Sequence, residues 1–164
     1  MRLKLLSALF LILLSSNLIL AQGSDPQARS PLNGFEAFIG GQWHLDGSYQ
    51  TFEWGVGKMS VISKSYFMMD GQSALVSEGM WFWHPGEKKI KGYFIASNMP
   101  DPLFEYETTF MDGKMINDLT TYNKAGEPTH YKETMEVTSS DSYEWILIQK
   151  GATIMSGTFN KKNY

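Results

Sequence analysis

The chain has 164 residues and no cysteine, which excludes disulfides, zinc–thiolate sites and thiol nucleophiles. Its 14 lysines and arginines and 17 aspartates and glutamates give a formal net charge of −3 without a basic patch, so nucleic acids and anionic membrane surfaces are poor partners. The length is that of a single domain with a core that needs no covalent staples.

The N-terminus has the features of a secretory signal. Arg2 and Lys4 precede an uncharged, mostly apolar run over 5–20, and small and polar residues follow from Ala21. This order predicts a signal peptide over 1–21 that is cleaved after Ala21. The alternative is a retained membrane anchor, but the run is short for a bilayer span. We therefore expect an exported protein, either periplasmic or secreted.

A polar, flexible lead-in is expected over 22–34, followed by one domain over 35–164. The domain opens with a predicted short helix. Phe35, Phe38 and Ile39 recur at helical spacing, and Gly40 with Gly41 ends the segment. This helix would close one end of the structure that follows.

The rest of the domain is a series of strand-like runs separated by turn residues. Asp70-Gly71 and Asp112-Gly113 are typical of hairpin turns, because a type I′ turn needs positive φ at both central residues. Regular spacing of such turns predicts a closed antiparallel up-and-down β-barrel of about ten strands, or nine if the first two merge. The predicted strands cover 41–46, 48–55, 58–69, 73–84, 88–97, 103–111, 114–123, 129–138, 142–150 and 152–161.

Alternation along the strands singles out two carboxylates. Glu78 shares a predicted inward face with Met80 and Phe82, and Glu133 shares one with Tyr131. An acid on an apolar face must be paired, hydrogen-bonded or neutral. The two acids could bind a ligand or act as acid and base, or each could only hydrogen-bond a side chain across the lumen. The predicted ligand-binding residues are Glu78, Met80, Phe82, Tyr106, Tyr131, Glu133 and Trp145.

Other kinds of site have little support. The three histidines, His44, His84 and His130, lie on different predicted strands without metal-ligand spacing. No serine sits in a G-x-S-x-G elbow, and no glycine-rich loop joins a strand to a helix. We expect no metal and no cofactor. Ten methionines and 14% aromatic residues suit a wall for apolar ligands, although they can equally fill a core.

Gly41-Gln42-Trp43, after the predicted helix and before the strands, resembles the G-x-W of the calycin superfamily. The longer stretch over 35–43 resembles the opening of an uncharacterised family of small, often exported, bacterial lipocalin-like barrels. Glu78-Gly79, Lys132-Glu133 and the segment 155–162 match this family too. The resemblance covers about 35–162 and implies a closed barrel with an interior pocket and no established activity.

Two positions depart from the family pattern. The family usually ends with Met-Glu, an aromatic residue and Arg-Lys, whereas this chain has Ser156 and Lys161 at the glutamate and arginine positions. The resemblance therefore implies that Lys161, in place of arginine, stacks on Trp43 as a structural pair. Related haem-binding barrels place a histidine near the last strands, and no histidine follows His130.

The leading functional prediction is an exported, monomeric barrel that binds a small apolar or amphipathic molecule. The only arginine after the predicted signal is Arg29, which lies before the domain, so a neutral or amine-bearing ligand fits better than a fatty-acid carboxylate. One alternative is an acid–base enzyme, an isomerase or hydrolase, that uses Glu78 and Glu133. Another is a structural envelope module whose barrel is packed solid.

Overall fold

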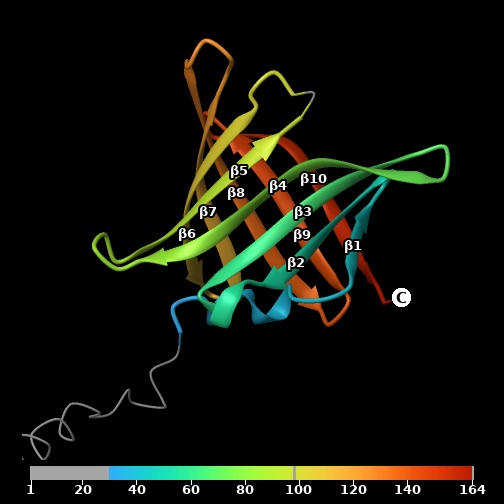
Figure 1. Ribbon diagram of the computed structural model, residues 1–164, viewed down its shortest axis with the longest axis horizontal. Coiled ribbons are helices and arrows are strands. Elements are labelled where there is room, and N and C mark those ends of the chain that lie inside the picture. The colour runs from blue at the N-terminus through green and yellow to red at the C-terminus, as the bar shows by residue number, and fades with distance from the viewer. Residues whose placement is uncertain (1–29, 98, 164) are drawn as a thin grey trace, which may run out of the picture. The chain divides into compact units, whose positions relative to one another are not determined.

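The chain folds into a closed antiparallel barrel in a computed structural model that describes residues 30–97 and 99–163 (Figure 1). The barrel order is β1-β10-β9-β8-β7-β6-β5-β4-β3-β2, which confirms the predicted ten-stranded, closed barrel. The expected signal peptide and the lead-in up to residue 29 lie outside the described residues. The strands are β1 (Gln42–Leu45), β2 (Ser48–Trp54), β3 (Ser60–Met69), β4 (Gln72–His84), β5 (Lys89–Ala96), β6 (Leu103–Met111), β7 (Lys114–Tyr122), β8 (Pro128–Ser139), β9 (Ser142–Gln149) and β10 (Ala152–Lys162).

The tight turns have the backbone geometry that their sequences predict. Asp70 and Gly71 have φ values of 51° and 77°, and Asp112 and Gly113 have 53° and 77°. Positive φ at both central positions matches the right-handed twist of the flanking strands. These turns therefore fix where β3 ends and β4 begins, and where β6 ends and β7 begins.

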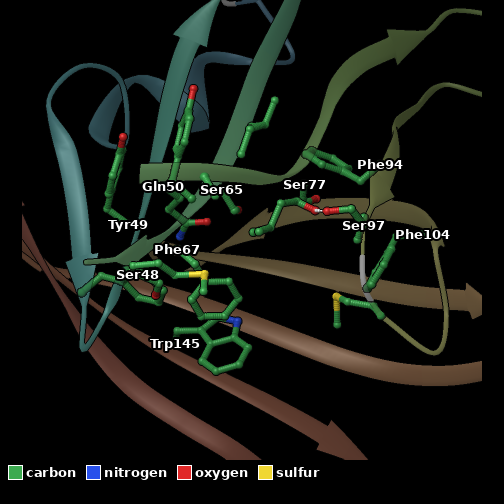
Figure 2. Close-up of a pocket in the computed structure, with 18 of the residues that line it drawn as sticks. Ser48, Tyr49, Gln50, Ser65, Phe67, Ser77, Phe94, Ser97, Phe104 and Trp145 are labelled. Atoms are coloured by element: carbon green, nitrogen blue, oxygen red, sulfur yellow. Dashed lines mark hydrogen bonds between the residues drawn. The ribbon is translucent and has the colours of Figure 1, made fainter. Parts of the chain in front are cut away.

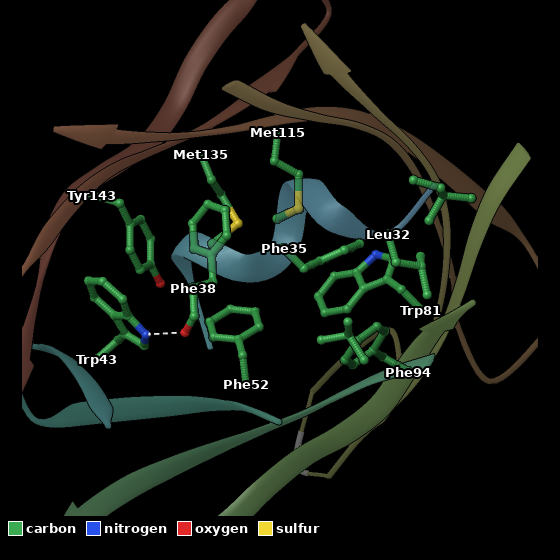
Figure 3. Close-up of a cluster of buried hydrophobic side chains, with 12 residues drawn as sticks. Leu32, Phe35, Phe38, Trp43, Phe52, Trp81, Phe94, Met115, Met135 and Tyr143 are labelled. Carbon is green, nitrogen blue, oxygen red and sulfur yellow. Dashed lines mark hydrogen bonds between the residues drawn. The ribbon is translucent and has the colours of Figure 1, made fainter. Parts of the chain in front are cut away.

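One end of the barrel is closed by the segment before β1. A short 3₁₀ helix, η1 (Asn33–Ala37), lies across this end, and a second one, η2 (Val56–Lys58), joins β2 to β3 (Figure 1). Phe35 and Phe38 are buried and point into the lumen. Phe38 packs at 5.6 Å from the ring of Phe52 and Phe35 at 5.2 Å from that of Trp81 (Figure 3). These aromatic contacts fill the closed half of the barrel and make up most of its core.

Trp43 ties this closing segment to the barrel. Its ring is fully buried, and its Nε1 donates a hydrogen bond of 2.8 Å to the backbone oxygen of Phe38 (Figure 3). The Nζ of Lys161 lies 4.9 Å from the centre of the Trp43 ring and donates to the backbone oxygen of Ile39 at 3.1 Å. The expected stacking of Lys161 on Trp43 is therefore present.

A β-bulge interrupts the alternation of side chains along β4. Ser65 pairs with Ser77 and Tyr66 pairs with Leu75, so Val76 is an extra residue with no partner on β3. An extra residue reverses the faces on either side of it, because neighbouring side chains in a strand point to opposite sides. The predicted faces of β4 assumed one unbroken alternation, and they are wrong beyond the bulge.

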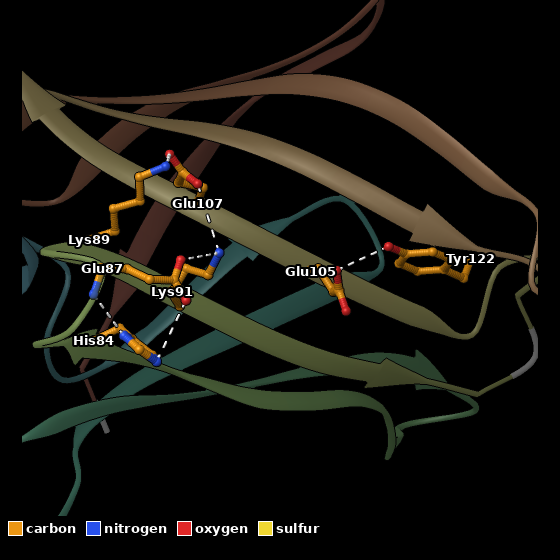
Figure 4. Close-up of polar contacts among 7 residues, drawn as sticks. All are labelled: His84, Glu87, Lys89, Lys91, Glu105, Glu107 and Tyr122. Atoms are coloured by element: carbon orange, nitrogen blue, oxygen red, sulfur yellow. Dashed lines mark hydrogen bonds and ion pairs between the residues drawn. The ribbon is translucent and has the colours of Figure 1, made fainter.

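Charged side chains gather on the outer surface of β4–β6 (Figure 4). Lys89 contacts Glu107 at 2.7 Å, and Lys91 contacts Glu87 at 3.1 Å. The hydrogen bond between Lys91 and Glu87 raises the pKa of Lys91 and lowers that of Glu87. These pairs are partly solvated, and such surface pairs contribute only about 0–1 kcal/mol each.

Candidate ligand-binding lumen

A cavity of about 610 Å³ lies inside the barrel (Figure 2). Its lining includes residues at the β3–β4 hairpin and in the β5–β6 connection, so it lies toward the end of the barrel opposite η1 (Figure 1). This volume falls within the range of about 300–1,000 Å³ that is usual for small-molecule sites. We call it the larger cavity, because a second cavity, of about 430 Å³, is described below. The described residues that line it come from β2–β6, β9, β10 and the β5–β6 connection: Ser48, Tyr49, Gln50, Ser65, Tyr66, Phe67, Met69, Ala74, Leu75, Val76, Ser77, Phe94, Ala96, Ser97, Met99, Phe104, Tyr106, Trp145 and Phe159.

A row of polar side chains crosses one wall of the larger cavity. Gln50 on β2 pairs with Ser65 on β3, and Ser65 pairs with Ser77 on β4. All three line the cavity (Figure 2). Residues that are directly opposite each other in neighbouring strands lie about 5 Å apart. The Gln50 amide nitrogen donates to the Tyr143 hydroxyl, which leaves the Gln50 amide oxygen and the two serine hydroxyls as a short hydrogen-bonding strip at a single level of the lumen. This polar row can meet a polar edge of a ligand.

Aromatic rings flank the polar row on both sides. Phe94 and Phe104 line the cavity from β5 and β6, and Trp145 lines it from β9 (Figure 2). Phe159 lines it from β10. Phe94 lies close to the backbone of β4 because Gly79 has no side chain there. A Cβ atom at Gly79 would lie only 2.5 Å from Cγ of Phe94 and 2.1 Å from the backbone oxygen of Tyr93. Aromatic walls with a few placed polar groups are typical of sites for amphipathic molecules.

A hydrogen-bonded network runs from Thr108 on β6 to Trp145 on β9. Thr108 Oγ1 donates to Asn117 Oδ1 at 2.6 Å, and Asn117 Nδ2 donates to Glu133 Oε2 at 2.6 Å. Trp145 Nε1 donates to the other oxygen, Glu133 Oε1, at 2.7 Å. Asn117 is fully buried. Both carboxylate oxygens of Glu133 therefore have a donor, and Glu133 fixes the orientation of the Trp145 indole at the cavity wall.

Burial raises the pKa values of the acidic groups in and near this network. Removal of Glu133 from water raises the pKa of its carboxyl group, although the hydrogen bonds from Trp145 and Asn117 act against this. Burial, with a smaller effect from the charge of Glu133, raises the phenol pKa of Tyr106 well above its usual value, and the same holds for Tyr143. No lysine or arginine is among the described residues that line the cavity. The lumen therefore disfavours an added negative charge.

Of the predicted ligand-binding residues, Tyr106 and Trp145 line the larger cavity. Tyr131 lines a second cavity of about 430 Å³, which we call the smaller cavity. Glu133 points into the barrel, where it accepts a hydrogen bond from Trp145, but it lines neither cavity. The structure brings these four residues into one barrel interior.

The other three predicted ligand-binding residues lie on the outer surface, so their predicted inward placement is wrong. Glu78 is exposed, and the side chain of Met80 is 45% exposed. Phe82 stacks outside the barrel at 6.2 Å from the ring of Tyr93. The bulge at Val76 is the physical reason, because beyond it the buried Trp81, rather than its neighbours, points into the lumen.

The sequence did not single out the polar row or Asn117. Serine and glutamine are common on solvated strands, and only the register of β2, β3 and β4 puts Gln50, Ser65 and Ser77 at one level. Asn117 lies two residues from both Met115 and Leu119, so in a strand it shares one face with these apolar residues. That pattern could have identified Asn117 as a buried polar residue.

The described residues contain no cluster of three or more histidine or acidic side chains that could hold a metal ion. His44 stacks on Tyr49 with ring centres 5.2 Å apart, and His130 shares a hydrogen bond of 3.0 Å with Thr120 on the surface. Over the same part of the chain, no helix has the length and apolar character needed to cross a bilayer. The lumen is thus the feature of the described residues with the clearest chemical character.

Comparisons with models of known protein families and with curated proteins find no match to this chain.

Proposed function

We propose that this chain is an exported, lipocalin-like binding protein that holds a small, uncharged or amine-bearing amphipathic molecule in its larger cavity. The observation that carries the proposal is the lining of this cavity, in which aromatic rings flank the polar row and no described lining residue is cationic. The apolar part of the ligand packs against Phe94, Phe104 and Trp145, and its polar edge meets the polar row. The resemblance to exported calycin-type barrels supports the same proposal.

The charge of the ligand follows from the buried network. A carboxylate in this cavity would lose water and find no cationic partner among the described lining residues, while Glu133 lies behind Trp145. Burial of an unpaired charge is costly. A hydroxyl, an amide or an amine instead finds acceptors and donors in the polar row. We therefore propose that the protein selects against fatty acids and related anions.

The acid–base alternative loses the pair of groups on which it was based. Glu78 is exposed on the outer surface of β4, whereas Glu133 is tied to Asn117 and Trp145 inside the barrel. The two carboxylates therefore do not face one substrate. A barrel packed throughout is also disfavoured, because the larger cavity lies in its open half.

Solvent extraction of the purified protein, followed by mass spectrometry, tests the proposal. We expect a neutral or amine-bearing amphiphile to be recovered from the wild type. Ala74→Trp places a large ring at the wall of the larger cavity and should reduce the amount recovered, whereas Ala125→Trp in the exposed β7–β8 turn should not. Repeated recovery of fatty acids from the wild type would contradict the charge argument.

A further inference from the structure

The open half of the lumen is divided into two cavities. The larger cavity borders β2–β6 and parts of β9 and β10, and the smaller cavity borders β6–β10. Both are lined by Met99 and Phe104, so they adjoin each other at these two side chains. Each volume, about 610 Å³ and about 430 Å³, lies in the range typical of a small-molecule site.

The side chains of Phe104 and Met99 separate the two cavities, and we call them the divider. Strand register fixes the position of Phe104. Phe104 on β6 pairs with Phe94 on β5 and with Thr121 on β7. Phe94 lines the larger cavity and Thr121 lines the smaller one, so the Phe104 ring stands between one residue of each. Met99, from the β5–β6 connection, is 48% exposed and completes the divider at the mouth with a flexible, apolar side chain.

The smaller cavity has the same chemical character as the larger one. Leu119, Leu147 and Met155 give it an apolar wall. Its polar lining residues are Tyr131, Asp101 and Thr121, and the Asp101 carboxylate accepts a hydrogen bond from the Thr121 hydroxyl. No lysine or arginine is among the described residues that line it. Each cavity therefore suits an apolar group, and neither offers a cationic partner for an anionic head group.

From this division we infer that the ligand is a lipid with two apolar chains and no net negative charge, with one chain in each cavity and its branch point over Phe104 and Met99. This inference rests on the proposed function of the larger cavity. A single-chain molecule fills one cavity and leaves the other in contact with water. A linker between two chains makes the second binding event intramolecular, which strengthens binding without any new contact.

Native mass spectrometry of the purified protein with two probes of matched chain length tests this inference. The single-chain probe is monooctanoylglycerol and the two-chain probe is dioctanoylglycerol. We expect up to two molecules of the single-chain probe per barrel but only one of the two-chain probe. The two-chain probe should bind tighter by about tenfold or more, which is a smaller gain than the roughly hundredfold to ten-thousandfold that linked binding can give.

Cavity-filling variants assign each chain to its cavity. Ala74→Trp fills the larger cavity and Leu147→Trp the smaller one, and each should bind one single-chain molecule and lose the advantage of the two-chain probe. Ala125→Trp in the exposed turn is the matched control and should behave as the wild type. Because the wild-type stoichiometry is measured independently, the inference stays testable even if a variant does not fold.

The outcomes separate this inference from the proposed function. One single-chain molecule per barrel, with no gain for the two-chain probe, would overturn the inference and leave the proposed function intact. Two single-chain molecules without a gain for the two-chain probe would also overturn it, because the cavities would then act as independent sites. Failure of the wild type to bind either probe would count against both.

Discussion

Replacement of Asn117 by aspartate tests the buried network beneath the larger cavity. Asparagine and aspartate have nearly the same shape, so Asn117→Asp keeps the packing and the acceptor for Thr108. It removes the Nδ2 donor and puts a carboxylate oxygen at the position that now lies 2.6 Å from Glu133 Oε2. Two carboxylates this close cannot both ionise readily, so one of them must hold a proton.

The size of the effect follows from what is lost. A hydrogen bond to a charged group contributes roughly 1.5–3 kcal/mol, and the repulsion between two carboxylates adds to this loss where both would otherwise be ionised. We expect Asn117→Asp to lower the free energy of unfolding by about 3 kcal/mol at pH 8, a large share of the roughly 5–15 kcal/mol typical of a domain.

The loss should depend on pH with a definite sign. Burial already raises the pKa of Glu133, and a second carboxylate raises the pKa of the pair further. When a folded-state pKa lies above the unfolded value, the associated stability is present at low pH and is lost as the pH rises through the folded pKa. The difference between the variant and the wild type should therefore be smaller at pH 5 than at pH 8.

Urea denaturation at the two pH values measures both quantities. The control is Asn160→Asp, because Asn160 is exposed on β10 and its side chain donates only to the backbone oxygen of Thr158, at 3.4 Å. A surface change of this kind should shift stability by less than about 0.5 kcal/mol. If Asn117→Asp behaves like this control, or loses equal stability at pH 5 and pH 8, the network is not as described.

Three further substitutions test which residues lie inside the barrel and which lie on its surface. Gly79→Ala should cost about 1–3 kcal/mol in urea denaturation, because its Cβ meets Phe94 and backbone, whereas Gly47→Ala meets nothing within 4 Å and should change little. Glu78→Gln should leave the affinity for dioctanoylglycerol unchanged, since Glu78 is exposed on the outer surface, and a large loss of affinity would contradict this placement. Lys89→Ala breaks an exposed pair with Glu107 and should lower stability by less than about 1 kcal/mol, a shift that denaturation in high salt should abolish.

The sequence was enough to predict the barrel because its turns are coded locally. Asp70-Gly71 and Asp112-Gly113 need no distant partner to adopt positive φ, and they set the strand boundaries in advance of any packing. The stacking of Lys161 on Trp43, which the family resemblance implied, is also present, and it forms where β1 and β10 pair to close the barrel.

The candidate site could be predicted only in part, because it depends on register and on one bulge. Along β8 alternation is unbroken from Tyr131 to Val137, and Glu133 does face inward. Along β4 no glycine or proline marks the extra residue Val76. Unbroken alternation along this strand therefore predicted Glu78 on the inward face, whereas it lies on the outer one. The two cavities arise from side chains of distant strands, and no local pattern in the sequence encodes such a division.

The most direct test of the central claim is calorimetric titration of the protein at pH 8 with 1-decanol and with decanoate, two ligands of equal chain length that differ in charge. The lumen accommodates the apolar chain of either one, but only the alcohol can meet the polar row without burying an unpaired charge. We predict saturable binding of decanol that is tighter than that of decanoate by about tenfold or more, which corresponds to a difference of about 1.4 kcal/mol or more. Equal or tighter binding of decanoate would contradict the claim.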